Sequence, residues 1–211
     1  VGAGVIRVIA TTHASPNVVR HEGRLTREQR FAALGSPGGT VLLTGLSGAG
    51  KSTVAAGVEE AFVRSGRPAY LLDGDNLRHG LNADLGFSDR DRTENVRRAG
   101  EVAAMFAEAG ALALIALICP FEEDRRLIRS LHEQAGLPFA EIFVDTSLEE
   151  CERRDAKGLY ARARAGQLPG FTGIDSAYEV PASPDLVLGH EAGSLPERIS
   201  LVLGLLDDLL R

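Results

Sequence analysis

The chain has 211 residues, a net charge of -6, 44% hydrophobic residues and 25% charged residues. This composition is typical of a globular protein and excludes a disordered or fibrous chain. The negative net charge also argues against a general nucleic-acid-binding protein, whose phosphate contacts require clustered Lys and Arg. An anionic ligand would therefore have to be bound by a local basic site.

The apolar segments and the cysteines indicate a cytoplasmic protein without a membrane partner. The apolar run of residues 111–118 is too short to cross a bilayer, and the first residues lack the charged start and cleavage site of a signal peptide. The two cysteines lie far apart and have no CxxC or Cys/His spacing. Neither a disulfide framework nor a zinc site is expected from this pattern.

The first part of the chain has no clear hydrophobic period. Residues 1–16 contain β-forming residues, as in GVIRVIATT, and are expected to be a linker or the remnant of a preceding domain with one short strand. A helix is expected from Thr26, because this capping residue precedes helix formers and the stretch GSPGG then stops them. Residues 17–211 are expected to form one domain.

Short apolar runs alternate with helical segments along the rest of the chain. The runs are TVLLTG, AYLLDGD, ALALIALIC, EIFVDT and PDLVLG. Strand, loop and helix repeated in this way predict an α/β fold with a parallel five-stranded sheet and helices on both faces. The expected helices are residues 51–64, 89–108, 122–134, 148–153 and 196–210.

The stretch GLSGAGKS, residues 45–52, matches GxxxxGKS and lies between an apolar run and an Ala-rich helical segment. Glycines let backbone N–H groups point inward and bind phosphate oxygens, and the following helix adds its positive N-terminal end. A chance glycine turn is the alternative, and the Lys-Ser pair in this context argues against it. The pattern predicts a P-loop NTPase fold with these residues at the nucleotide: Gly45, Leu46, Ser47, Gly48, Ala49, Gly50, Lys51, Ser52 and Thr53.

Two carboxylates follow the second apolar run in the stretch LLDGDNLRHGLN. Asp73 and Asp75 are expected at the carboxyl end of a strand, where open α/β sheets bind their ligands. A carboxylate there can accept or orient the proton of a hydroxyl acceptor, and carboxylates also suit Mg²⁺. Aspartates after a strand are common helix caps as well, so the cap interpretation stays open for either residue.

Cationic and aromatic residues follow the carboxylates. Guanidinium groups suit phosphate and sulfate oxygens, and an aromatic face suits a purine ring. The alternative is that these residues form a solvated helix face. This interpretation is favoured for Arg97 and Arg98, whereas anion binding is favoured for Arg78 and Arg92. The cationic and aromatic residues of this segment are Arg78, His79, Phe87, Arg92, Arg97 and Arg98.

A basic stretch with several glycines, RRDAKGLYARARAGQLPGFTG, lies later in the chain. It predicts a mobile lid over residues 153–175, in which Lys157 is the best-placed cation.

Several motifs of the sequence together resemble those of adenylylsulfate (APS) kinases. The resemblance rests on GLSGAGKST, LLDGDNLRHGLN, LGFSDRDRTENVRR, FVDTSLEECERRDAKGLYARARAG and GFTGIDSAYEVP, and it extends from about Asn17 to about Leu188. It implies transfer of the γ-phosphoryl group of ATP to the 3′-hydroxyl of adenosine 5′-phosphosulfate (APS), with Mg²⁺ as cofactor. Many NTPases share the phosphate loop, whereas the other motifs are far more specific.

The resemblance also implies roles for single residues. Asp73 is the expected proton acceptor, with Asp75 and Ser52 at Mg²⁺, directly or through water, and the reverse assignment of the two aspartates stays open. Phe87 and Phe171 would stack on the two faces of the purine. Catalysis is assigned to Asp73, Asp75 and Lys51. The residues expected to bind APS are Asp75, Asn76, Arg78, Phe87, Arg92, Asn95, Ile118, Cys119, Lys157, Gly170 and Phe171.

Cys119 departs from the family pattern, which commonly has a serine there that has been proposed as a phosphoserine intermediate. Since a thiol is a poor substitute for such a site, direct transfer is expected, with Cys119 in the wall of the pocket. A minor hypothesis is redox control through Cys119 or Cys151, because a thiol near several arginines could have a lowered pKa.

The resemblance implies a homodimer, and the chain, which begins with Val1 rather than Met, is expected to be the C-terminal part of a fusion behind the GTPase-type subunit of sulfate adenylyltransferase. One alternative to APS kinase activity is that of another P-loop kinase, for gluconate, shikimate or a nucleoside monophosphate. The other is a nucleotide-sensing module of a sulfate-activating complex with little turnover.

Overall fold

The computed structural model describes residue 17 and residues 23–211. The prediction of a linker or domain remnant at residues 1–16 lies outside the described residues and stays a prediction. The described part begins with α1 (Arg27–Leu34), which Thr26 caps as predicted: its hydroxyl accepts from the backbone N–H of Gln29 at 3.2 Å. Gly35 ends this helix with a φ of 67°, a conformation that favours glycine.

Five parallel strands form the single sheet of the described chain, in the order β2-β3-β1-β4-β5. The prediction of a parallel five-stranded sheet is therefore confirmed. Because all strands run the same way, their carboxyl ends lie along one edge, where the following loops meet. The strands are β1 (Gly39–Thr44), β2 (Ala69–Asp73), β3 (Leu112–Ala116), β4 (Phe139–Phe143) and β5 (Leu186–Val187).

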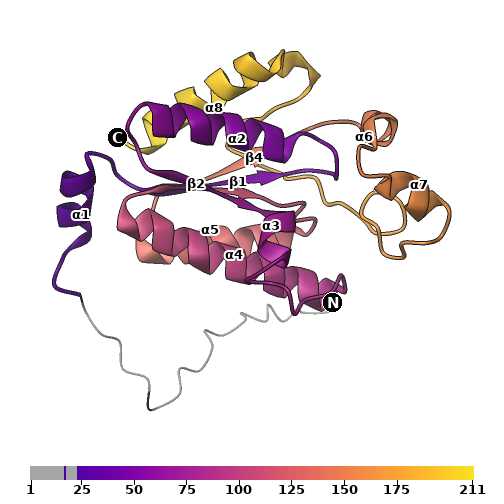
Figure 1. Ribbon diagram of the computed structural model, residues 1–211, viewed down its shortest axis with the longest axis horizontal. Coiled ribbons are helices and arrows are strands. Elements are labelled where there is room, and N and C mark those ends of the chain that lie inside the picture. Colours follow the sequence, from indigo (N-terminus) through magenta and orange to yellow (C-terminus); the bar gives the residue numbers. More distant parts are fainter. Residues whose placement is uncertain (1–16, 18–22) are drawn as a thin grey trace, which may run out of the picture.

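Helices cover both faces of the sheet (Figure 1). The helices α2 (Lys51–Arg64) and α8 (Leu195–Leu209) lie on one face, and α4 (Asp89–Ala109) and α5 (Glu122–Ala135) lie on the other. These four agree with the predicted ranges within one residue at each end, as does α6 (Leu148–Arg154). The sequence did not predict three short elements: α3 (Gly74–Arg78), α7 (Leu159–Arg164) and the 3-10 helix η1 (His190–Ala192).

The strands separate two hydrophobic clusters. On β1, Val41 and Leu43 pack into the cluster under α2 and α8, whereas Leu42 packs into the cluster under α4 and α5. Successive side chains of a strand point to opposite faces, so a strand that is buried on both faces consists mainly of apolar residues. This explains why the first apolar run of the sequence does not alternate with polar residues.

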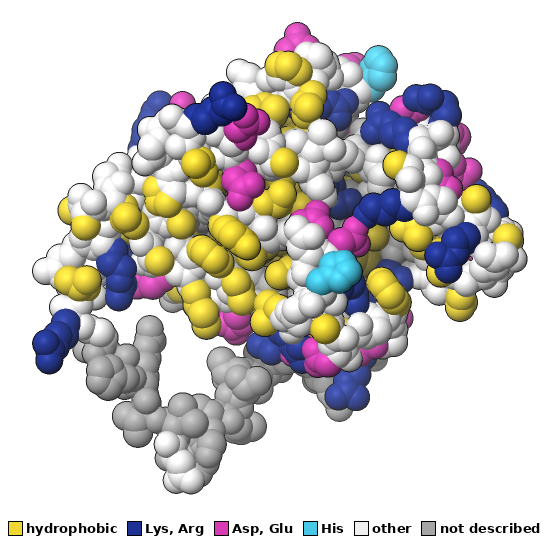
Figure 2. Space-filling view, viewed as in Figure 1, with side chains coloured by type: hydrophobic (Ala, Val, Ile, Leu, Met, Phe, Trp, Pro, Cys, Tyr) yellow, Lys and Arg dark blue, Asp and Glu magenta, His cyan; other side chains and the backbone are white. Residues whose placement is uncertain are grey.

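One edge of the sheet, at β2, carries an apolar groove that we call the β2 groove. It has a volume of about 440 Å³ and is lined by residues that include Val63, Ala69, Tyr70 and Phe106, whose ring stacks on that of Tyr70 at 5.1 Å between centroids. Figure 2 shows hydrophobic side chains gathered on this face, between α2 and α4. The backbone N–H of Leu71 on β2 donates to the Glu59 carboxylate at 2.8 Å, which occupies part of the strand edge.

Among the described residues, no helix combines the length and the apolar character that a bilayer crossing requires.

Candidate functional site

The phosphate loop connects β1 to α2 at the carboxyl edge of the sheet. Gly45 has a φ of 144°, and a Cβ there would lie 2.6 Å from the carbonyl oxygen of Val144. Gly50 has a φ of 106° directly before α2. Side chains would strain both positions, so the glycines are required for a loop whose N–H groups converge at the start of a helix. The predicted strand, loop and helix context is confirmed.

Lys51 is the buried cation of this loop. Its ammonium group donates to the carbonyl oxygens of Gly45 at 2.9 Å and Leu46 at 2.7 Å. Burial lowers the pKa of Lys51 to about 8, because the charged form loses solvation. Its two partners are neutral carbonyl oxygens, and the phosphate oxygens of a ligand at the loop would give this ammonium group anionic partners.

Ser52 and Asp73 join the phosphate loop to the end of β2. The Ser52 hydroxyl donates to Asp73 Oδ2 at 2.5 Å, across 21 positions of sequence. Asp73 Oδ1 accepts from the backbone N–H groups of Asp75 at 2.9 Å and Asn76 at 3.4 Å and so caps α3. The cap interpretation of Asp73 is confirmed, and the same carboxylate contacts the phosphate loop through Ser52.

The second carboxylate, Asp75, faces the lid. Its Oδ2 forms an ion pair with Lys157, and both side chains are more than half exposed. The oxygen atoms of Ser52 and Asp73 are ligands of the kind that Mg²⁺ prefers, so the residues present fit the expected metal ion.

Arg78 and Phe87 form a pair beside α3. The Arg78 guanidinium carbon lies 4.3 Å from the centre of the Phe87 ring, and its Nη1 donates to the carbonyl oxygens of Leu85 and Gly86. The Phe87 side chain is 69% exposed, so one ring face is open to a planar ligand. Asn76 is exposed on α3, two positions before Arg78.

Arg92 and Asn95 lie in the first two turns of α4. Arg92 Nη1 donates to the Thr172 hydroxyl at 2.6 Å, and Nη2 donates to the carbonyl oxygen of Gly170, so this arginine binds the lid. Asn95 is buried, and its Oδ1 accepts from the Asn82 amide at 2.9 Å. Arg97 and Arg98 instead form ion pairs with Glu94, which agrees with the preference for a charged helix face.

Thr44 is a residue of the site that the sequence analysis did not select. Its hydroxyl oxygen lies 2.6 Å from the carbonyl oxygen of Ile118 and 2.9 Å from the Tyr178 hydroxyl. It therefore joins the start of the phosphate loop to the segment after β3 and to the stretch GFTGIDSAYE. The signal for Tyr178 was its place in that quoted stretch, whereas a threonine inside an apolar strand gives none.

Cys119 lies after β3 in a strained and buried position. Its φ of 44° is rare for a residue with a side chain, and its carbonyl oxygen accepts from Arg125 Nη1 at 2.9 Å. Burial raises the pKa of the Cys119 thiol well above its usual range, and burial also raises that of Cys151. The hypothesis of a thiol with a lowered pKa is wrong in direction, because Arg125 acts on Cys119 less strongly than the loss of solvent.

The segment predicted as a lid contacts the phosphate loop. Asp155 accepts from the backbone N–H groups of Tyr160 and Ala161 at 3.0 Å each and so holds the start of α7. The Tyr160 hydroxyl donates to the carbonyl oxygen of Ser47 at 2.8 Å, and the Phe171 ring lies against the Tyr160 ring. The segment predicted as a lid therefore lies at the site, and α7 lies at the right of Figure 1, beyond the ends of the strands.

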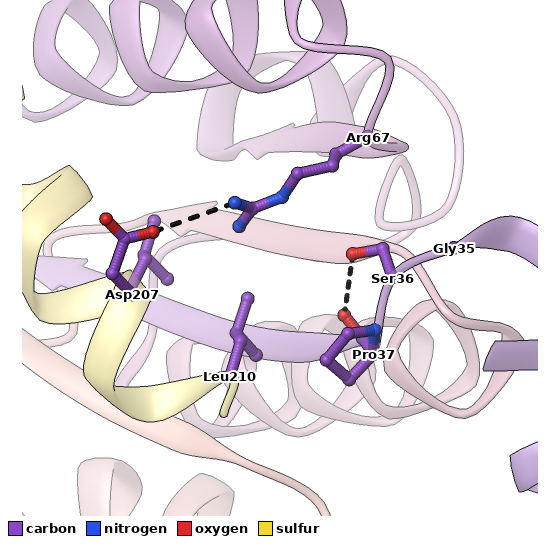
Figure 3. Close-up of a pocket in the computed structure, with 7 residues that line it drawn as sticks. Gly35, Ser36, Pro37, Arg67, Asp207 and Leu210 are labelled. Atoms are coloured by element: carbon purple, nitrogen blue, oxygen red, sulfur yellow. Dashed lines mark hydrogen bonds and ion pairs between the residues drawn. The ribbon is translucent and has the colours of Figure 1, made fainter. Parts of the chain in front are cut away.

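A separate concave site lies near the other end of the sheet. It has a volume of about 150 Å³, and Arg67 and Asp207 face each other in it at 3.7 Å (Figure 3). Ser36 and Pro37, which precede β1, line the same cavity. None of the predicted site residues lines it, so the candidate functional site is the one at the carboxyl edge.

Comparison with known proteins agrees with this geometry. A family model described as "Adenylylsulphate kinase" matches residues 37–189 of the chain. The adenylyl-sulfate kinase of Geotalea uraniireducens is 50% identical over 187 residues, which cover 89% of both chains. The chain belongs to the adenylylsulphate kinase family. The motifs that carry the resemblance in the sequence thus identified the family correctly.

Two Mycobacterium tuberculosis relatives extend the comparison of this family member. The structure of the APS kinase CysC in complex with AMPPNP and APS has a TM-score of 0.79 and 54% identity, and it covers 82% of this chain and 99% of that chain. The bifunctional enzyme CysN/CysC of strain H37Rv is 51% identical over 208 residues, or 98% of this chain and 33% of that enzyme. The chain thus spans about a third of the length of this bifunctional relative.

Proposed function

We propose that this protein phosphorylates the 3′-hydroxyl of APS with ATP, giving 3′-phosphoadenylyl sulfate and ADP. The observation that carries the proposal is the 2.5 Å hydrogen bond between Ser52 and Asp73, since it places the phosphate loop next to the DGDN motif. Family membership at about 50% identity and the APS-bound relative support the same acceptor. In-line transfer needs mainly positioning and charge neutralisation, which a loop and a strand end at this distance can supply.

The acceptor is tested by offering ATP and Mg²⁺ with a panel of hydroxyl compounds. APS should support rapid ATP consumption, and gluconate, shikimate and nucleoside monophosphates should not. If one of these compounds were phosphorylated faster than APS, the chain would be another P-loop kinase. If APS bound without turnover, the nucleotide-sensing alternative would hold.

ATP and Mg²⁺ are assigned to the loop and its neighbours. The phosphates would lie against residues 45–53, with Lys51 at the β- and γ-phosphates. Ser52 and Asp73 would hold Mg²⁺, directly or through water, because their oxygen atoms already lie together. When bound, the ion neutralises charge on the transferring phosphoryl group.

The roles of the two aspartates follow from their contacts. The hydrogen bonds of Asp73 to Ser52 and to the start of α3 favour it as the residue at Mg²⁺. Among the described residues Asp75 forms an ion pair with the exposed Lys157 alone, and it would orient and deprotonate the 3′-hydroxyl once Lys157 moves toward a phosphate. This is the reverse of the assignment that the sequence suggested first, and it is the alternative that was left open.

APS is assigned to the residues of α3, the start of α4 and the predicted lid segment that contact one another. Phe87 and Phe171 would lie on the two faces of its purine, and Arg78 and Arg92 would meet its anionic groups. Arg92 also donates to Gly170 and Thr172, so it would connect the anionic groups of APS to the predicted lid segment. The remaining APS contacts we propose are Asn76, Asn95, Ile118, Cys119, Lys157 and Gly170.

Transfer is proposed to be direct, without a covalent enzyme intermediate at Cys119. The thiol is buried and its pKa is raised, so it is protonated and a poor nucleophile at neutral pH. Cys119→Ala should therefore keep kcat within about threefold of the unchanged protein, measured with saturating ATP and APS. Loss of turnover in a variant that still binds APS would restore a covalent role for this residue.

We further propose that the kinase forms a homodimer through the β2 groove. Val63 and Tyr70 expose about half of their side chains there, beside an edge strand, and large exposed apolar patches mark interaction sites. Light scattering should give twice the mass of the chain. A single-chain mass at micromolar concentration would contradict the proposal.

The kinase is also proposed to act in the cytoplasm, fused to or in complex with sulfate adenylyltransferase subunits. The match to the bifunctional enzyme covers 98% of this chain, against 89% for the Geotalea uraniireducens kinase. Both cysteines are free thiols, as is usual in a reducing compartment. Intact mass of the native cellular protein tests the fusion, because a native chain of only this length would contradict it.

A further inference from the structure

Tyr160 connects two parts of the site that lie far apart in sequence. Its side chain is 3% exposed, and its hydroxyl donates to the carbonyl oxygen of Ser47, in the middle of the phosphate loop, at 2.8 Å. A buried tyrosine hydroxyl usually has such a partner, because leaving it unpaired costs the solvation it has lost. The position of the ring is therefore tied to the position of the Ser47 peptide.

The other side of the Tyr160 ring contacts Phe171. The two ring centroids are 5.0 Å apart, and the planes meet at 80°, an edge-to-face arrangement. Phe171 belongs to a turn in which Asp175 accepts from its backbone N–H at 2.6 Å. The turn holds the Phe171 backbone, and its ring packs against the hydrophobic cluster that contains Tyr160, so a shift of Tyr160 would shift Phe171.

We propose that Tyr160 is a positioning residue that couples nucleotide binding at the phosphate loop to APS binding at Phe171. The proposal rests on the proposed function, in which the loop binds ATP phosphates and Phe171 stacks on the purine of APS. When the N–H groups of the loop bind phosphates, the orientation of the Ser47 peptide becomes fixed. The hydrogen bond then fixes the rigid Tyr160 ring, which holds Phe171 in its stacking position and so lowers the ordering cost of APS binding.

Another contact to the same loop provides a matched control. The Thr146 hydroxyl donates to the carbonyl oxygen of Ala49 at 2.9 Å, from the segment between β4 and α6. Thr146→Val removes one hydroxyl bond to the loop, as Tyr160→Phe does, but it leaves the contact between the Tyr160 and Phe171 rings. Tyr70→Phe removes a tyrosine hydroxyl on β2, at the β2 groove.

The experiment measures the Kd of APS by calorimetry with and without saturating AMPPNP. The ratio of the two values is the coupling factor, which we expect to be about tenfold or more in the unchanged protein. Tyr160→Phe should lower this factor about three- to tenfold, the effect of one hydrogen bond, with the Kd of APS alone within twofold. Thr146→Val and Tyr70→Phe should leave the factor unchanged.

Phe171→Leu gives a second test that keeps the hydrogen bond between Tyr160 and Ser47. It should weaken APS binding and also lower the coupling factor, and adding Tyr160→Phe to it should have no further effect on the factor, because both changes break the same connection. A coupling factor that Tyr160→Phe leaves within twofold, or that Thr146→Val lowers equally, would overturn the proposal. Failure of the unchanged protein to bind APS in either state would instead overturn the proposed function.

Discussion

Lys51→Ala should lower kcat/KM for ATP about 10³-fold, the loss that follows removal of one preorganised group from a site of developing charge. Lys51 is the cation of the phosphate loop, and its ammonium group is held by the loop carbonyl oxygens of Gly45 and Leu46. Without it, the charge that develops on the β- and γ-phosphates would lack its nearest fixed partner. Steady-state kinetics with APS as acceptor measures the effect.

The same variant should remain folded, which separates a catalytic effect from unfolding. Burial lowers the pKa of Lys51 to about 8, so the folded state binds this proton less tightly than the unfolded chain does, and keeping the charge costs folding free energy at neutral pH. Removing this charge removes a cost of folding, and Lys51→Met, which keeps most of the side-chain volume, should have a Tm equal to or above that of the unchanged protein. A Lys51→Ala protein that transferred phosphate at the normal rate would contradict the mechanism.

The elements of the fold could be predicted because their signals are local. The apolar runs, the capping threonine at residue 26 and the GxxxxGKS pattern each lie within a few positions of sequence, and each was found where expected. The helix α3 was missed because five residues are too few for a hydrophobic period. Its cap comes from Asp73, a residue whose carboxylate had been considered for chemistry as well.

The connections within the site could not be predicted from local patterns. Arg92 binds Thr172 across 80 positions, and Lys157 pairs with Asp75 across 82 positions. The sequence indicates the charge of each residue but does not indicate its partner. Thr44 was missed for a related reason, because its role depends on the loop after β3 and on Tyr178, to which nothing in its own strand points.

Burial explains why the expected pKa shift of the Cys119 thiol was wrong in direction. Several arginines near Cys119 in the sequence suggested a lowered thiol pKa, but the side chain is 2% exposed and loss of solvation raises its pKa. The arginine that reaches this residue, Arg125, donates to its backbone carbonyl oxygen. A count of nearby charges gives the wrong sign where a group is fully enclosed.

The two aspartates give the sharpest test of the chemistry. Asp75→Asn should lower kcat by about 10² to 10⁴, because the amide cannot accept the proton of the 3′-hydroxyl, while the Kd of APS changes little. Asp73→Asn should instead raise the Mg²⁺ concentration needed for half-maximal rate. Its fold should persist because asparagine also caps helices well. Single-turnover rates across a Mg²⁺ titration measure both variants.

The opposite effects of the two substitutions would make Asp73 the proton acceptor and Asp75 the residue at Mg²⁺. If Asp73→Asn lowered the single-turnover rate at every Mg²⁺ concentration and Asp75→Asn shifted the Mg²⁺ dependence, Asp73 would be the proton acceptor that the sequence first suggested. The geometry argues against this result, since Asp73 already accepts from the Ser52 hydroxyl and from two backbone N–H groups at the start of α3. In the proposed mechanism Asp75 would release Lys157, its exposed partner, to a phosphate and turn to the hydroxyl.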